Sequence, residues 1–231
     1  MATINATTSQ GGYLNQTQAI ASWSWEDICY ASSAASDTYP NSNDIYTQAS
    51  YNVGRSATWG CGRGYLVFDT SVITGTLTDI KLKIFCTDMF NLVYTPEAVL
   101  YNSTSPTLST SLSSTDFKNR GNQISDPFTS SGWEWLDIGL NGTGLSIAET
   151  ENEMTIVLRD WYYDAEYYTN FESPPGIGFM GYFHNEAGYI PYLEYTMTVA
   201  GYRQIVNGII PANMSKVDGI AKASISKVVG V

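Results

Sequence analysis

Aromatic rings and carboxylates, the side chains best suited to chemistry here, gather in RDWYYDAEYYTNFES, residues 159–173 of this 231-residue chain. Aromatic rings offer broad apolar faces on which sugar rings can stack, and carboxylates accept hydrogen bonds from sugar hydroxyls. The mixture predicts a glycan-contacting loop, unless its rings pack onto the body of the protein or onto a neighbouring subunit. The side chains assigned to this glycan site are Trp161, Tyr162, Tyr163, Asp164 and Tyr167.

The segment SWSWEDICY, residues 22–30, raises the same two possibilities. If the segment is a strand, Trp23 and Trp25 lie on one face, because alternate residues of a strand point the same way. Both tryptophans then belong either to the core or to an exposed platform. We add both to the candidate glycan site on the second of these interpretations.

Catalytic groups are harder to assemble from this sequence. A serine or cysteine nucleophile needs a histidine base, and the only histidine, His184, lies in GYFHNEAG, a predicted hairpin that no GxSxG motif precedes. Cys61 lies between glycines rather than at the start of a helix. Paired carboxylates such as Asp164 and Glu166 suit glycoside hydrolysis, which is the third alternative. We expect no catalytic residue and no enzyme.

Metal ligands are equally sparse. The three cysteines, Cys29, Cys61 and Cys86, show no CxxC spacing, and together with one histidine they make a poor zinc site. Asp69 follows a strong strand and suits a side chain that accepts hydrogen bonds from turn amides; calcium ligation is the alternative, but no DxDxDG loop is present. We expect no metal and no cofactor. The thiols should be buried, with one disulfide possible outside a cell.

The charge of the chain limits its partners. The formal net charge is −11 and the eleven Lys and Arg residues are scattered, so nucleic acid is not an expected partner. No apolar run approaches the roughly 18 residues that a membrane span needs, so we expect no membrane contact either. The opening MATINATTSQGG lacks the basic and apolar regions of a signal peptide, which predicts synthesis in a cytoplasm.

Short strands are the elements that must position these side chains. The strongest runs are GRGYLVFDTS (residues 62–71) and DIKLKIFCTD (79–88), which a Gly-containing link separates. Further strand-like runs lie at residues 97–104, 133–140, 153–161, 177–183 and 190–199. Each run is bounded by turn residues, so the pattern predicts an all-β fold, an antiparallel jelly-roll β-sandwich.

Two regions depart from the strand pattern. Residues 146–153, SIAETENE, carry Ser146 and Glu149 at capping-box spacing, which predicts a helix of one or two turns that starts at Ser146. Residues 31–50 are polar and rich in turn residues, and we expect a long surface loop there. The sandwich should occupy residues 1–200, which leaves 201–231 as a C-terminal tail.

The strand pattern resembles that of the DNRLRE-type domains, which are jelly-roll modules related to carbohydrate-binding families. The resemblance lies in a Leu-x-Phe-Asp strand, in the apolar strand that follows it, and in closing strands with a Pro, Leu and Tyr pattern. The matching positions are Leu66, Phe68 and Asp69, then Leu77, Ile80, Leu82 and Ile84, and finally Pro191, Leu193 and Tyr195. The resemblance spans residues 3–199 and implies the fold more than the function.

The chain ends in a repeat with a period of eleven: VNGIIPANMSK, VDGIAKASISK and VVGV, residues 206–231. An 11-residue period suits a right-handed supercoiled helix, but Asn207-Gly208 and Asp218-Gly219 are turn signals. Each cassette should therefore hold a turn and then a short helical turn, which cannot bury its own apolar side chains and must cover a surface. The residues assigned to partner docking are Val206, Ile209, Ile210, Met214, Val217, Ile220, Ile225 and Val228.

These cassettes resemble the short terminal repeats of bacteriophage structural proteins and of related microbial surface proteins. The opening MATINATT is similar to the openings of such virion proteins. The resemblance implies a non-enzymatic virion protein of a tailed phage, in the capsid decoration, head fibre, neck or tail, bound to other virion proteins and to its own copies, with a trimer as the first expectation. The alternative is a carbohydrate-binding adhesin that contacts host-surface glycans, and one protein can be both.

Overall fold

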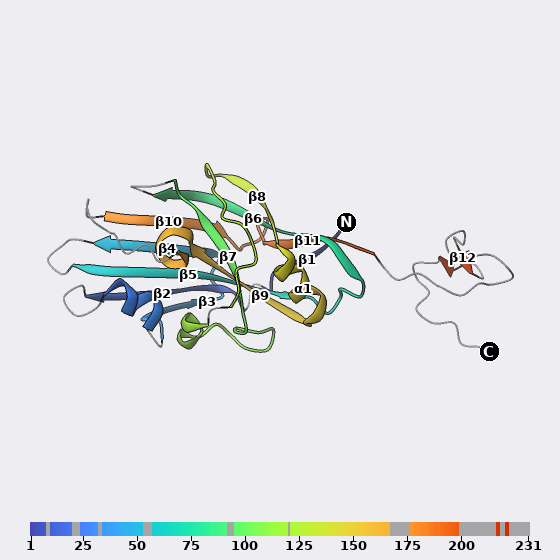
Figure 1. The fold of residues 1–231 in the computed structure, drawn as a ribbon, viewed down its shortest axis with the longest axis horizontal. Helices are drawn as coiled ribbons and strands as arrows, with labels where there is room; N and C mark the ends of the chain where they lie inside the picture. Colours follow the sequence, from blue (N-terminus) through green and yellow to red (C-terminus); the bar gives the residue numbers. More distant parts are fainter. Residues whose placement is uncertain are drawn as a thin grey trace.

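Antiparallel strands dominate this protein, and the all-β fold expected from the sequence is confirmed (Figure 1). The computed structural model describes residues 1–7, 10–19, 24–31, 34–52, 57–91, 95–119, 121–166, 176–198, 216–217 and 220–221. Within this part of the chain, 11 strands join into one open sheet that folds into a sandwich around an apolar core.

The strands of this sheet are β1 (Ala2–Asn5), β2 (Gly12–Ala19), β3 (Asp37–Pro40), β4 (Asp44–Asn52), β5 (Thr58–Asp69), β6 (Thr76–Asn91), β7 (Ala98–Ser103), β8 (Glu134–Gly139), β9 (Glu153–Asp160), β10 (Gly176–His184) and β11 (Tyr192–Thr198). The helical elements are the π-helical turn η1 (Asp27–Ala31), the 3-10 turn η2 (Ser114–Lys118), the helix α1 (Gly142–Thr150) and the π-helical turn η3 (Trp161–Ala165). A separate pair, β12 (Lys216–Val217) and β13 (Ile220–Ala221), lies in the tail.

The two layers of the sandwich separate at the long strands β5 and β6. One edge of β5 pairs with β2, while its other edge pairs with β4 as far as Gly62 and with β9 from Gly64 onward. β6 likewise pairs with β11, β10 and β8. The hydrogen-bonded order is therefore β1-β11-β6-β10-β4-β5-β2-β3, with β9 and then β7 branching from β5 and with β8 branching from β6. Figure 1 shows β10, β4, β5 and β2 side by side.

Contacts between the end of β1 and β5 join the two layers of the sandwich a second time. Ala6, which follows β1, bridges to Phe68 of β5, and the Thr7 amide donates to the Val67 carbonyl at 2.7 Å. Because β5 is covered on both of its faces, every residue from Gly60 to Phe68 is buried. The strand that the sequence marks as the strongest is thus the centre of the core.

The helix α1 begins at Gly142, not at the predicted Ser146. The side chain of Asn141 accepts hydrogen bonds from the amides of Thr143 and Gly144, so the asparagine is the N-cap. Glu149, the other half of the expected capping box, instead accepts a hydrogen bond from the Leu77 amide of β6. The prediction of a short helix was right, and its start was wrong because a better cap lies upstream.

The surface loop predicted for residues 31–50 is wrong, because this stretch contains β3 and most of β4. β3 pairs only with β2 among the described strands, so it is an edge strand, and such strands tolerate polar and Pro residues. β4 pairs with β10 and β5, and its Ile45 and Ala49 are buried while Tyr46 and Gln48 lie on the other face. The strands were not recognised in the sequence because only one face of each is apolar, which leaves the stretch polar overall.

The turn predicted at Asp69 agrees with the structure. Asp69, at the end of β5, accepts hydrogen bonds from the Ser71 amide at 3.1 Å and from the Ser71 hydroxyl at 2.5 Å. In the tail, β12 and β13 are antiparallel and Val217 is paired with Ile220, while Asp218 and Gly219, where a turn was predicted, lie outside the described residues. The other docking residues of the tail lie outside the described residues: Val206, Ile209, Ile210, Met214, Ile225 and Val228.

None of the helices in the described ranges combines the length and the hydropathy that crossing a membrane requires.

Replacing Gly64 by alanine should destabilise the protein, because the added Cβ would lie 2.3 Å from Cγ2 of the buried Ile45. Overpacking of this kind costs about 1–3 kcal/mol, which urea unfolding followed by tryptophan fluorescence can measure. Gly139→Ala in β8 is the matched control, since a Cβ at that position meets no atom within 4 Å. Equal stability of the two variants would contradict the close approach of β4 and β5 near Gly64, where β5 changes its pairing from β4 to β9.

Candidate binding site

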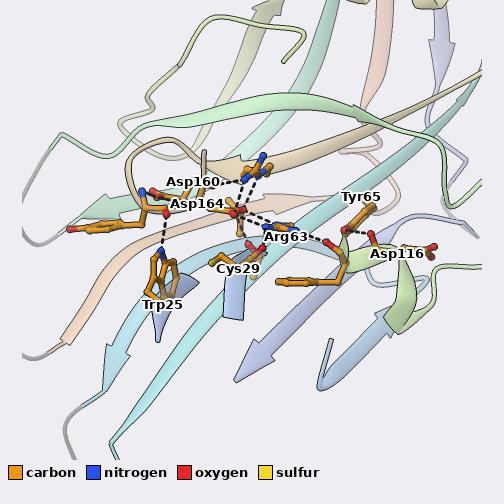
Figure 2. A network of polar contacts seen from close by, with 12 residues as sticks. Trp25, Cys29, Arg63, Tyr65, Asp116, Asp160 and Asp164 are labelled. Carbon is orange, nitrogen blue, oxygen red and sulfur yellow. Dashed lines mark hydrogen bonds and ion pairs between the residues drawn. The ribbon is translucent and has the colours of Figure 1, made fainter. Parts of the chain in front are cut away.

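The two segments that the sequence assigns to glycan contact meet inside the protein, at a buried ion network (Figure 2). Asp164 of η3 lies between two guanidinium groups. Arg63 donates to it from Nε at 2.8 Å and from Nη2 at 2.6 Å, and Arg159 donates from Nε and Nη2, each at 2.9 Å. The three side chains are at most 4% exposed. We call Arg63, Arg159 and Asp164 the ion network.

The ion network also holds the irregular segments of the chain against the sheet. Nη1 of Arg63 donates to the carbonyl of Phe117 in η2, and Nη2 donates to the carbonyl of Cys29 in η1 at 2.9 Å. The same guanidinium lies 4.3 Å from the centre of the Phe117 ring, and that of Arg159 lies 4.5 Å from the Tyr101 ring. These contacts give each buried cation several electron-rich neighbours.

Trp25 and Tyr163 are core residues, which contradicts their assignment to a glycan site. Trp25 Nε1 donates to the Tyr163 carbonyl at 2.8 Å, and the two side chains are only 3% and 1% exposed. Trp25 lies in the helical turn that leads into η1, so the predicted strand is also wrong there. The assignment of Asp164 fails for the same reason, because both of its oxygens bind arginine. Trp161 and Tyr162 are half-buried, while Trp23 and Tyr167 lie outside the described residues.

Asp164 of η3 and Asp160, the residue that caps this turn at the end of β9, have opposite electrostatic environments. Burial alone would raise the pKa of Asp164, but Arg159 and Arg63 outweigh it and hold this pKa well below its ordinary range. Burial raises the pKa of Asp160 well above its ordinary value, although the amides of Tyr163 and Asp164 donate to it. Such divergent pairs occur in acid–base catalysis, but these two side chains have no exposed surface, so their role is structural.

A buried group of possible metal ligands adjoins the ion network. Sγ of Cys29, Sγ of Cys61 and a carboxylate oxygen of Asp164 lie within 4.8 Å of one another. Both cysteines are free thiols, and burial raises the pKa of Cys29 well above its ordinary value. A metal cation would need thiolates and would have to compete with two guanidinium groups for Asp164. These residues therefore do not fit a cation.

An open groove on the opposite face of the β4–β5 region is the candidate binding site. It has a volume of about 280 Å³ and is lined by Tyr13, Asn15, Tyr39, Asp44, Tyr46, Gln48 and Tyr182. We call these residues the tyrosine groove. The Tyr13 and Tyr39 rings are stacked with their centres 4.4 Å apart, Tyr46 meets Tyr13 edge-on at 5.4 Å, and Tyr182 lies 5.0 Å from Tyr46.

Strand register explains why the tyrosines gather. Tyr13 of β2 is paired with Tyr39 of β3, and Tyr46 of β4 is paired with Tyr182 of β10. Paired residues lie on the same face of a sheet, so each pair forms one part of the groove. β5 separates the two pairs and contributes Gly62, where a Cβ would lie 3.4 Å from Cδ1 of Tyr46. The glycine leaves a flat floor over which Tyr46 reaches Tyr13.

The groove offers hydroxyl and amide groups beside its rings. Burial and then the neighbouring Tyr39 and Asp44 raise the pKa of Tyr13, and burial also raises the pKa of Tyr46 and of Tyr182. These hydroxyls therefore remain protonated at neutral pH and can both donate and accept hydrogen bonds. The hydroxyl of Tyr46 already donates to Oε1 of Gln48, which fixes the ring.

None of the groove tyrosines was predicted from the sequence as a binding residue. The available signal was alternation at three of the four tyrosines, which neighbour a buried residue in their strand: Leu14 follows Tyr13, Ile45 precedes Tyr46 and Phe183 follows Tyr182. Alternation shows that a ring faces away from the core, but not which other strands stand beside it. The segment with the most aromatic residues was preferred instead, and its buried members serve the core.

No protein-family model matches this chain, and a search of curated proteins finds no match either. The resemblances to DNRLRE-type domains and to phage terminal repeats therefore stay predictions.

Asp164→Asn should destabilise the protein by about 3–5 kcal/mol at neutral pH, because two buried arginines lose the carboxylate that they share. The folded-state pKa of Asp164 is depressed, so the stability that it contributes is present above the ordinary value of 3.8 and is lost as the pH falls below it. The difference in unfolding free energy between the wild type and the variant, measured by urea unfolding at several pH values, should therefore become smaller at acidic pH. Asp69→Asn, at an exposed turn, is the control; a similar loss in both variants would contradict the role given to the ion network.

Proposed function

We propose that this chain is a non-enzymatic structural protein of a bacteriophage particle, bound to sister copies or to other virion proteins through its C-terminal cassettes. The observation that carries the proposal is the repeat itself, whose apolar positions recur every eleven residues over 206–231. The antiparallel pairing of Val217 with Ile220 supports a turn-based cassette over a continuous helix. Such short units gain stability chiefly from the surface that they cover, which favours a docking role.

The core chemistry supports a role without catalysis. Asp164, whose residue type and neighbours in the sequence would suit glycoside hydrolysis, has both oxygens bound to arginine and no exposed surface. His184 stacks on Phe85 and Tyr189, and its Nδ1 lies 3.4 Å from a carboxylate oxygen of Asp44, rather than against a nucleophilic hydroxyl or thiol of the described residues. The arrangement therefore favours binding over reaction.

Deleting residues 202–231 should dissociate the full-length oligomer into monomers, because the cassettes supply the apolar docking surface. Size-exclusion chromatography with light scattering measures the change, and thermal unfolding shows whether the sandwich still folds. A finer pair of variants replaces an apolar docking residue, Ile209→Asp, and a polar residue of the same cassette, Ser215→Asp. The proposal fails if the truncated chain keeps the native oligomeric state and still joins particles.

A second candidate function, a carbohydrate-binding adhesin, is favoured by the tyrosine groove. Its rings offer apolar faces for stacking on sugar rings, and Asn15, Asp44 and Gln48 offer the few polar groups that fix a ligand's orientation. Tyr39 is 43% exposed and Tyr182 is 36% exposed, so both rings are open to a ligand. The two functions are compatible, since the tail would attach the protein and the groove would face a host surface.

Tyr39→Ala should weaken glycan binding by about tenfold, because it removes a stacking face without opening the core. A glycan array followed by titration calorimetry on the best ligand measures the effect. Trp161→Ala tests the loop preferred by the sequence, and Trp133→Ala tests a ring that is 75% exposed outside the groove. Loss of binding in either tryptophan variant, with Tyr39→Ala unaffected, would place the glycan elsewhere.

A further inference from the structure

We propose that the tyrosine groove selects saccharides that carry a free, protonated amino group. The inference rests on the second candidate function, glycan binding, and names the class of sugar that the groove takes. It follows from two properties of the groove: several tyrosine faces surround the cavity, and the charged groups nearest to them are carboxylates.

The tyrosine faces are the first property. An aromatic ring carries negative potential on its face, so a cation placed above it is attracted, and ammonium groups are bound in this way in aromatic-lined sites. Tyr13, Tyr39, Tyr46 and Tyr182 approach one another within 4.4–5.4 Å between ring centres, so a ligand in the cavity meets more than one ring at once. A neutral sugar gains only the stacking part of this interaction.

The carboxylates are the second property. Asp44 lines the cavity itself. Asp37 of β3 is paired with Asn15 on one side of the groove, and Asp88 of β6 is paired with Tyr182 on the other. These carboxylates flank the groove from both sides, and their negative charge also contributes to the raised pKa values of Tyr13 and Tyr182. The resulting potential favours a cationic ligand and opposes one with a carboxylate, phosphate or sulfate.

The basic groups near the groove do not cancel this potential. Among the described residues, no Lys, Arg or His lines the cavity. His184 adjoins the lining through Asp44: its Nδ1 lies 3.4 Å from Asp44 and 3.6 Å from Glu186, so it is shared between two carboxylates. Arg63 lies in the same strand as Gly62, but its side chain faces the core, where it and Arg159 share Asp164. The charged side chain that lines the groove itself is therefore acidic.

The test compares three oligosaccharides of equal length by titration calorimetry with the full chain: a free-amine glucosamine oligomer, its N-acetylated counterpart and a uronic acid oligomer. The measurements are made at mildly acidic pH, where the amine is protonated and the carboxylates are ionised. We expect the free-amine oligomer to bind about tenfold more tightly than the N-acetylated one, and the uronic acid oligomer to bind least. The preference should shrink as the salt concentration rises.

Two aspartate variants separate the charge effect from stacking. Asp44→Asn should bring the affinities for the free-amine and N-acetylated oligomers close to each other, because it removes a negative charge from the cavity while the ring faces are retained. Asp126→Asn is the matched control, an exposed aspartate that does not line the groove. Thermal unfolding of each variant confirms that both are folded.

The possible outcomes distinguish this inference from the function on which it rests. Equal affinity for the free-amine and N-acetylated oligomers, unchanged by Asp44→Asn, would overturn the charge selection and leave glycan binding intact. Binding of neither oligomer, nor of any neutral glycan, would overturn both proposals. A preference that Tyr39→Ala abolishes and Asp44→Asn reduces supports the inference in full.

Discussion

The structure depends on the burial of two arginines, Arg63 and Arg159, which the ionised Asp164 stabilises between them. A buried cation is tolerated only with partners of opposite charge and with its remaining donors satisfied. One carboxylate cannot neutralise two guanidinium groups, and the carbonyl oxygens of Cys29, Phe117 and Asp164 supply the rest. The segments that provide these oxygens have little regular structure of their own, so the ion network fixes where they lie on the sheet.

The same strand that carries Arg63 into the core also builds the floor of the tyrosine groove. In β5, Cys61, Arg63 and Tyr65 point to the side of the ion network, while Gly60 and Gly62 lie against β4 residues of the other face. In the motif GCGRG, glycines that face the groove side therefore alternate with residues that face the ion network. Glycine suits the groove side because Tyr46 and Gln48 occupy the space that a side chain would need.

A rigid sandwich with an aromatic face, joined to a tail of apolar cassettes, suits a protein that binds at both ends. The groove lies on paired strands, whose register holds its rings in place, rather than on a loop. The proposed attachment uses the tail and the proposed glycan binding uses the groove. The two candidate functions therefore involve different residues and are compatible in one chain. The acidic net charge of −11 is consistent with the preference inferred for cationic ligands.

The sequence by itself determined the all-β class, the central strand at residues 62–71, the turn at Asp69 and the repeat of the tail, because each is written in local periodicity or turn chemistry. It could not determine that Trp25, Tyr163 and Asp164 turn inward, since that follows from partners far away in the chain: Arg63 lies 101 residues from Asp164, and Trp25 lies 138 residues from Tyr163. Nor could it assemble the tyrosine groove, because Tyr13, Tyr39, Tyr46 and Tyr182 come from separate strands. Only the order and register of those strands decide which side chains become neighbours, and both are set by long-range pairing that local patterns do not encode.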